Sequence, residues 1–227
     1  MTDIRVLRGD AERNRVRLVE TASCAFAECG FDVSMDEIAK RAGLGKGTIF
    51  RRFPTKEHLV AAIACERMGE LLETGTALLA EPNAGLAMRD FMRSAVALLS
   101  RDRGLTEAIH GLSCDNIDIQ EAKHDIIDTV AALLTRAQAQ RSIRDDISAC
   151  DIMLMVAAVS HIAAPFSSVD TTIWTRYLDL VFDGLRSESA SVLSHPAPTD
   201  EQMMAASFAG AHTFRHKILR EPEDALT

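Results

Sequence analysis

The chain has 227 residues, 47% of them hydrophobic and 5% aromatic, which allows a sizeable core and favours helices over strands. Its net charge of −8 argues against a uniformly basic nucleic-acid binder, and its five scattered cysteines argue against a disulfide framework. The start of the chain lacks the apolar core of a signal peptide, and the longest apolar run, residues 152–166, is too short to span a bilayer. We therefore expect an all-α protein in the reducing cytoplasm.

The first element expected along the chain is a polar arm over residues 1–9, followed by a helix that begins near Asp10. Apolar residues then recur at helical spacing, and Cys29-Gly30 ends the helix, because glycine suits the left-handed position after a helix.

A second helix begins at a capping box, the sequence from Ser34 to Glu37, and stops at Ala42. A tight turn over residues 43–45 leads to a short third helix that ends before Pro54. Residues 34–53 therefore predict two helices joined by a glycine turn, which is the outline of a helix-turn-helix that reads DNA.

The charge of this region differs from that of the rest of the chain. Residues 1–58 carry eleven basic and nine acidic side chains, whereas the remainder carries fourteen basic and twenty-four acidic ones. From Lys40 to Lys56 there are six basic residues and no acidic one. Because salt screens distant charges, such a local basic patch indicates a polyanionic partner, with a solvated basic face as the alternative.

After residue 54 the pattern stays helical. Thr55 is expected to cap a fourth helix that runs to about Ala80. Further helices are predicted at about 84–101, 104–114, 117–140, 148–168 and 171–186, two of them opened by a capping box or cap at Ser148 and Asp170. A Ser/Pro/His-rich linker follows over residues 187–198, and a capping box at Thr199 predicts a tail helix near 200–219.

The chain resembles the TetR family of bacterial regulators. Residues 34–57 match the helix-turn-helix of the family in order, spacing and termination, and Gly30-Phe31 also fits. Residues 177–186 resemble the last helix of many members, and residues 82–186 loosely resemble one branch of its ligand-binding domains. The tail after Ser187 is longer than the common pattern.

The resemblance implies a domain organisation and a function. We expect a three-helix DNA-binding domain over residues 1–58, a larger helical-bundle domain for effector binding and dimerisation over 59–186, and a linker with a tail helix of unknown role over 187–227. The implied function is that of a sequence-specific transcriptional regulator, a repressor that a small-molecule effector of unknown identity releases from its double-stranded operator. Release would follow from a population shift between two shapes of the sensor.

Contact with DNA requires small residues where the backbone nears the duplex, cations for phosphates, and side chains that reach base edges. Gly45 and Gly47 are small, Lys56 opens the fourth helix, and Arg51 or Arg52 suits guanine. The DNA-binding residues expected on this basis are Lys46, Gly47, Thr48, Phe50, Arg51, Arg52, Lys56, Arg13 and Arg17. Phe50 stands where the family often has a tyrosine, so this chain lacks the hydroxyl that often contacts phosphate in the family. Ile49 and Phe53 are assigned to the core.

The resemblance also implies a homodimer that joins through the last two helices of the sensor. The helix at 148–168 is apolar on nearly every face, so it must be buried on all sides. The expected interface residues are Met153, Val156, Trp174, Tyr177, Val181 and Leu185, with simple packing inside one chain as the alternative.

An apolar effector pocket is expected among the helices of the sensor domain. Its candidate lining residues are Phe91, Met92, Ile109, Leu112, Ile127, Val130, Met155 and Val159, and for each of them plain core packing is the alternative.

Metal and enzyme functions find little support. His110 and Cys114 are spaced for one helix face, with His124 and His161 elsewhere, but nothing fixes a third ligand. The glycines around Lys46 do not form a phosphate-binding loop, and no hydrolase or metalloprotease motif occurs. We expect no enzyme activity, cofactor, metal or membrane partner. The alternatives are a helical small-molecule-binding protein or enzyme without specific DNA binding, and a nonspecific architectural DNA binder.

Overall fold

The computed structural model describes residues 3–101, 116–166, 169–189, 191–199, 201, 202 and 205. Its α-helices are α1 (Asp3–Cys29), α2 (Met35–Arg41), α3 (Lys46–Arg52), α4 (Lys56–Leu78), α5 (Ala84–Arg101), α7 (Ile117–Ala139), α8 (Ala149–Ala163) and α9 (Trp174–Leu185). Short 3-10 turns are η1 (Gly30–Asp32), η2 (Ala164–Phe166) and η3 (Ser187–Ser189). Within these residues the β structure is one isolated bridge between Ile143 and Arg186, so the all-α prediction is confirmed.

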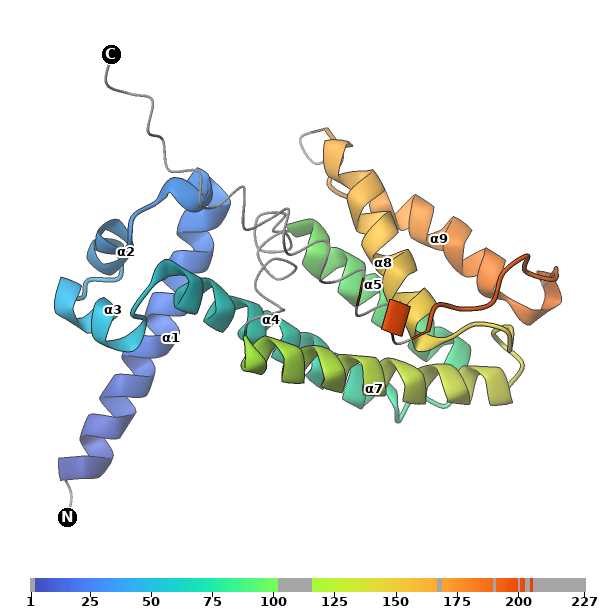
Figure 1. The fold of residues 1–227 in the computed structure, drawn as a ribbon, viewed down its shortest axis with the longest axis horizontal. Helices are drawn as coiled ribbons and strands as arrows, with labels where there is room; N and C mark the ends of the chain where they lie inside the picture. The colour runs from blue at the N-terminus through green and yellow to red at the C-terminus, as the bar shows by residue number, and fades with distance from the viewer. Residues whose placement is uncertain are drawn as a thin grey trace.

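The helices form two groups joined by one long helix. Figure 1 shows α1, α2 and α3 at one end of the molecule, α5, α7, α8 and α9 at the other, and α4 running from the first group into the second. We call the group of α1 to α3 the head and the other group the sensor bundle. The long helix α4 therefore connects a small three-helix unit to a larger bundle.

Two predicted helix ends at the start of the chain and at α8 are wrong. The helix α1 begins at Asp3, so residues 3–9 are helical where a polar arm was predicted; no proline interrupts the stretch, and the single Gly9 costs only about 1 kcal/mol in a helix. The helix α8 ends at Ala163 and not near residue 168, because Pro165 lacks the N–H that the next helical turn would need.

The start of α9 also differs from the prediction. Instead of capping a helix from residue 171, the Asp170 carboxylate accepts hydrogen bonds from the Thr172 N–H at 2.8 Å and from its hydroxyl at 2.7 Å. This local turn delays the helix to Trp174.

Some predicted elements fall outside the described residues. The helix expected at 104–114 does so entirely, and only residues 201, 202 and 205 of the tail helix are described. The capping box ahead of that helix is present: the Thr199 N–H donates to the Gln202 side chain at 2.9 Å, and the Gln202 N–H donates to the Thr199 hydroxyl at 3.2 Å.

The core of the sensor bundle forms where α4, α5 and α7 come close. Phe91 is fully buried, and a Cβ atom at Gly75 would lie 2.7 Å from Thr129 and 3.0 Å from the Phe91 ring. Only glycine therefore allows α4 to approach its neighbours so closely. This contact fixes the path of the connecting helix against the bundle.

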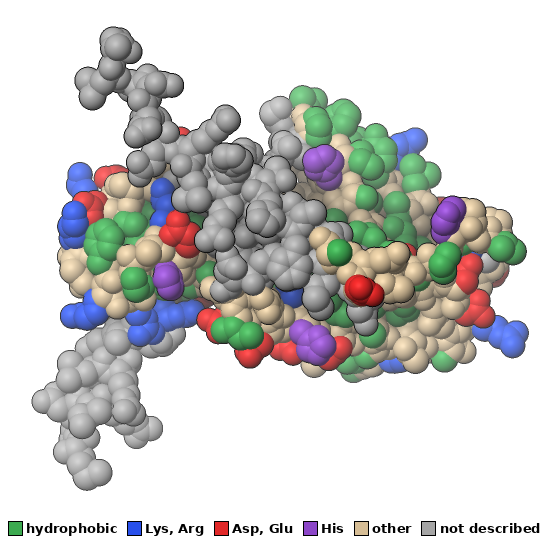
Figure 2. Space-filling view, in the orientation of Figure 1, with side chains coloured by type: hydrophobic (Ala, Val, Ile, Leu, Met, Phe, Trp, Pro, Cys, Tyr) green, Lys and Arg blue, Asp and Glu red, His purple; other side chains and the backbone are tan. Residues whose placement is uncertain are grey.

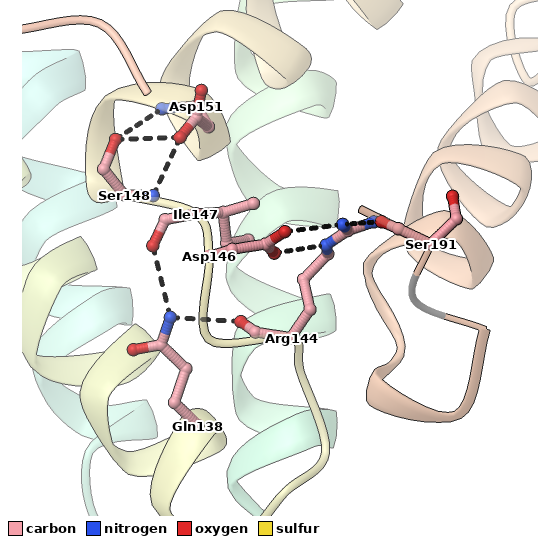
Figure 3. Close-up of polar contacts among 7 residues, drawn as sticks. All are labelled: Gln138, Arg144, Asp146, Ile147, Ser148, Asp151 and Ser191. Atoms are coloured by element: carbon pink, nitrogen blue, oxygen red, sulfur yellow. Dashed lines mark hydrogen bonds and ion pairs between the residues drawn. The ribbon is translucent and has the colours of Figure 1, made fainter. Parts of the chain in front are cut away.

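A buried arginine ties the segment after α9 to the connection between α7 and α8 (Figure 3). Arg144 is 7% exposed, and its guanidinium pairs with both oxygens of Asp146, at 2.5 and 2.8 Å, while also donating to the Ser191 carbonyl. The Gln138 amide donates to the Arg144 carbonyl at 3.1 Å and to the Ile147 carbonyl at 3.2 Å. The start of the predicted linker is thus held against the sensor bundle.

Candidate nucleic-acid interface

The turn between α2 and α3 is built by local hydrogen bonds. The Ser34 hydroxyl accepts from the Glu37 N–H at 3.2 Å, which caps α2 as the sequence predicts. After α2 the Gly43 N–H donates to the Lys40 carbonyl at 3.0 Å, and Gly43 itself has a φ of +65°. The left-handed glycine reverses the chain direction and sends it into α3.

One side of α3 packs into the head and the other faces outward. Ile49 is fully buried and Phe53 is 5% exposed, so their assignment to the core is confirmed. The candidate contacts Lys46, Gly47, Phe50, Arg51 and Arg52 are exposed, and Thr48 is half-buried. Figure 2 shows Lys and Arg side chains gathered over the end of the molecule that the head forms. The buried face holds α3 in place while the outer face presents its cations.

Lys46, at the start of α3, already has two partners in the head. Its Nζ lies 2.6 Å from the Asp36 carboxylate and 5.7 Å from the centre of the Phe50 ring. The two charged side chains remain largely exposed, at 69% for Lys46 and 50% for Asp36. The lysine is therefore at the surface but electrostatically paired.

Arg41 is held in the same way. Its guanidinium pairs with Glu28 at 3.0 Å and with Glu37 at 3.1 Å, and these hydrogen bonds raise its pKa above the ordinary arginine value. Residues 40–56 contain no acidic residue in sequence. In the folded head, however, α1 and α2 place carboxylates next to this basic stretch. The spacing of Glu37 and Arg41, four residues apart on one helix, was the available signal.

Lys56, the first residue of α4, is half-buried. Burial lowers its pKa from the usual value, while nearby Asp32 and Glu57 act in the opposite direction. Thr55 precedes the helix but makes no capping bond to its backbone; its hydroxyl lies 2.9 Å from the His58 ring nitrogen and also bonds Glu57, which lowers the pKa of that carboxyl. The first backbone N–H groups of α4 are therefore not capped by this side chain.

Arg13 and Arg17, the two arginines of α1 that are predicted to bind DNA, lie about one helical turn apart. Arg13 is exposed. Arg17 donates a hydrogen bond to the carbonyl of Ala42, at the end of α2. Arg17 thus fixes the turn of the helix-turn-helix from α1, a structural contact that sequence reasoning did not identify.

The predicted effector residues that the structure describes differ in burial. Phe91, Met92, Val130 and Val159 are buried core residues, and Met155 is half-buried. Ile127 is 36% exposed, so the structure places it at the surface of α7 and not in an enclosed pocket. Ile109 and Leu112 lie outside the described residues.

A groove of about 230 Å³ lies between α4 and α5. It is lined by Arg67, Glu70, Leu71, Thr74, Ser94, Ala97 and Leu98. Arg67 pairs with Glu70 at 2.8 Å and reaches the Ser23 hydroxyl of α1 at 3.5 Å. Sequence reasoning missed this groove because every lining residue that it proposed lies after α4; the polar residues at helical spacing along α4 were the available signal.

Burial within the chain divides the predicted dimer residues into two groups. Val156 and Leu185 are 1% and 4% exposed within the chain, so they belong to its own core and leave no surface for a partner. Met153, Trp174, Tyr177 and Val181 are half-buried against that core. The exposed apolar side chains of α8 and α9 are instead Leu154 at 45%, Ile162 at 49% and Leu180 at 59%. The sequence of α8 does not separate its buried from its exposed positions, because the helix is apolar all round.

The described residues offer neither a metal site nor a membrane span. Among them, no three His, Cys, Asp or Glu side chains gather closely enough to hold a metal ion, and His110 and Cys114 lie outside these residues. No helix in the described part of the chain is both long and apolar enough to cross a membrane.

Comparison with known proteins gives matches to both parts of the chain. Residues 18–63 match the family described as bacterial regulatory proteins, tetR family, and residues 83–187 match the C-terminal domain described as transcriptional regulator SbtR-like. An HTH-type transcriptional regulator of Staphylococcus aureus is 44% identical over 54 residues, which make up 23% of this chain and 29% of that protein. The match to this relative thus covers under a third of its length.

Solved structures match over most of the chain. A TetR transcription regulatory protein from Mycobacterium vanbaalenii is 35% identical, with a TM-score of 0.60 over 79% of this chain and 99% of that one. A TetR transcriptional regulator from Streptomyces coelicolor is 29% identical, with a TM-score of 0.59 over 76% and 98% of the two chains. The regulator FadR from Bacillus subtilis, solved with stearoyl-CoA, is 18% identical with a TM-score of 0.59 over 75% and 99%, a likeness of fold.

Proposed function

The chain belongs to the TetR family of bacterial regulatory proteins, and on that premise we propose that it is a homodimeric repressor that binds operator DNA through α3 and leaves it when a small molecule binds. The observation that carries the proposal is the two-sided character of α3. Buried Ile49 anchors the helix to the head, while Lys46, Arg51 and Arg52 point their charges to the surface.

The size and charge of α3 suit the major groove. Its seven residues span about 10 Å, and the groove is about 12 Å wide. Arg51 or Arg52 would read guanine edges, while Lys46 and Lys56 would contact phosphates and set the position of the helix. The glycines at 45 and 47 are exposed and leave room for the backbone to approach.

One such helix reads only a few base pairs, so a second copy of the chain is needed for a specific site. The exposed stripe of Leu154, Ala158 and Ile162 on α8, with Leu180 on α9, is the surface we assign to the dimer. These side chains recur at intervals of four along α8, which places them on one face. Burying them against a partner removes apolar area from water, and the two heads would then present α3 at half-sites about one helical turn apart.

Effector release would act through α4, because this helix joins the head to the sensor bundle. The groove between α4 and α5 and the half-buried Met155 are candidate contacts for a small molecule. Arg67, in that groove, also reaches Ser23 of the head, so a molecule that displaces Arg67 would alter a contact with α1. A relative of the same fold, the Bacillus subtilis FadR, was solved with stearoyl-CoA, which supports a small-molecule ligand as the class of effector.

A gel-shift experiment with DNA from upstream of the protein's own gene tests the proposal. We expect a complex with that DNA at concentrations far below those needed for random duplex of equal length. Equal binding to both duplexes would identify a nonspecific architectural protein, and binding to neither would favour a ligand-binding protein or enzyme. A thermal-shift screen with small molecules, followed by addition of each hit to the complex, tests effector release.

A further inference from the structure

The pair of Lys46 and Asp36 places a carboxylate beside a cation that is proposed to contact DNA. Lys46 begins α3 and Asp36 lies in the first turn of α2, so the contact of 2.6 Å crosses the helix-turn-helix itself. The ring of Phe50, one turn along α3, lies under the same ammonium group at 5.7 Å. The lysine is therefore held between an acidic side chain and an aromatic face on the outer side of the head.

We infer that Asp36 restrains Lys46 and thereby weakens the binding of the head to DNA of any sequence, which sharpens the contrast between operator and random DNA. The inference rests on the proposed contact of α3 with DNA. It assigns a role in specificity to an acidic residue that does not itself contact a base.

The physical reason is competition for one ammonium group. A phosphate that approaches Lys46 must share it with a carboxylate already at hydrogen-bond distance, and the carboxylate also repels the phosphate. A lysine neutralised by a neighbouring acid adds little to the release of counterions from the duplex, and this release drives nonspecific binding. A specific complex has base contacts in addition, so it depends less on this one cation.

The head contains a matched control for this effect. Glu37, the next residue on α2, pairs with Arg41, but Arg41 also pairs with Glu28 at 3.0 Å. The change Glu37→Gln therefore removes the same charge from the same helix and leaves the cation with a second acidic partner. Asp36→Asn removes the one carboxylate paired with Lys46 among the ion pairs of the described head.

The test measures binding to a random-sequence 30-base-pair duplex by fluorescence anisotropy over a series of KCl concentrations. We expect Asp36→Asn to bind this duplex about fivefold more tightly than Glu37→Gln at low salt. We also expect the slope of log K against log salt to steepen by about 0.9, the contribution of one phosphate contact. In the Lys46→Ala background the difference between the two changes should disappear.

Two results would overturn the inference. Equal effects of Asp36→Asn and Glu37→Gln would show only a general gain from removing negative charge, and a gain from Asp36→Asn that persists without Lys46 would place its origin elsewhere. Either result leaves the proposed function standing if the wild-type protein binds its upstream DNA. A wild-type protein that binds no duplex at all would contradict the proposed function as well. Thermal unfolding of each variant confirms that the fold is retained.

Discussion

The guanidinium of Arg17 in α1 donates a hydrogen bond to the carbonyl oxygen of Ala42, the residue at which α2 ends. The contact joins positions 25 residues apart and holds the turn of the helix-turn-helix against the first helix. A carbonyl at the end of a helix lacks an intrahelical partner, so a cationic donor is well placed there. Arg17, which is predicted to bind DNA, thus also holds the turn of the helix-turn-helix in place.

Gly43, the next residue, should tolerate no side chain. Its φ is +65°, and a Cβ atom would lie 2.9 Å from the Arg17 guanidinium, so Gly43→Ala should cost about 1–2 kcal/mol of stability and disturb that contact. Chemical denaturation measures the change. Gly47→Ala is the control, since a Cβ there meets nothing within 4 Å and helical alanine is favourable. Equal effects of the two changes would contradict the assigned strain.

Removing the charge of Lys56 should weaken binding to every sequence alike. Lys56→Ala is expected to flatten the slope of log K against log salt by about one unit, because one phosphate contact is lost. Lys56→Arg keeps the charge and should keep the slope. Because burial lowers the pKa of Lys56 below 10.5, wild-type binding should weaken on raising the pH earlier than that of the arginine variant. A slope that stays the same in Lys56→Ala would exclude a phosphate contact.

Arg51 and Arg52 should separate into a base contact and a phosphate contact. Truncation to alanine of the one that reads a base should cost about 1–3 kcal/mol on the operator and relax the preference at one base pair. Truncation of the other should weaken binding to operator and random DNA equally. Titrations against a set of single-base operator variants distinguish the two. Equal losses on both kinds of DNA for both arginines would remove them from base readout.

The exposed stripe on α8 and α9 should control assembly without controlling folding. Leu180→Asp places a charge at a position that is 59% exposed within one chain. We therefore expect sedimentation analysis to show monomers, while the circular dichroism spectrum stays that of a folded helical protein. Val156→Ala instead removes buried methyl groups and should cost about 1–3 kcal/mol of stability. A dimer that survives both Leu180→Asp and Leu154→Asp would place the interface on another surface.

The ion pair of Arg144 and Asp146 should make the stability of the fold depend on pH in the acidic range. The hydrogen bond from Arg144 lowers the pKa of Asp146 below 3.8, so this carboxylate stabilises the fold above its unfolded pKa and loses that contribution as the pH falls through its folded pKa. The stability difference between wild type and Asp146→Asn should therefore be constant near neutral pH and shrink below about pH 4. Urea unfolding across this range measures it. A difference that persists unchanged in acid would refute the pairing as its source.

The helix-turn-helix was predictable because its signals are local. A capping serine, a left-handed glycine and a terminating proline each act within a few residues, so Ser34, Gly43 and Pro54 mark the boundaries of α2 and α3 well. Burial of Ile49 follows from the same short pattern.

Features set by distant contacts were not predictable. The pairing of Lys46 with Asp36 and of Arg17 with Ala42 depends on how helices pack, and neither spacing is a helical one. The outer face of α8 was missed because Val156 and Leu154 are alike in sequence and differ only in what lies against them. The hydrogen bond from the Arg144 side chain to the Ser191 carbonyl joins residues 47 apart. The composition of the predicted linker does not indicate this contact.

Protection of lysines from acetylation by DNA tests the central claim most directly, because it reports which surface meets the duplex. Five lysines occur in the chain, with Lys46 and Lys56 on the proposed contact surface and Lys123 on α7 of the sensor bundle. Saturating operator DNA should slow the modification of Lys46 and Lys56 several-fold and leave Lys123 unchanged. Protection of Lys123 with full reactivity at Lys46 and Lys56 would show that DNA binds another face of the molecule.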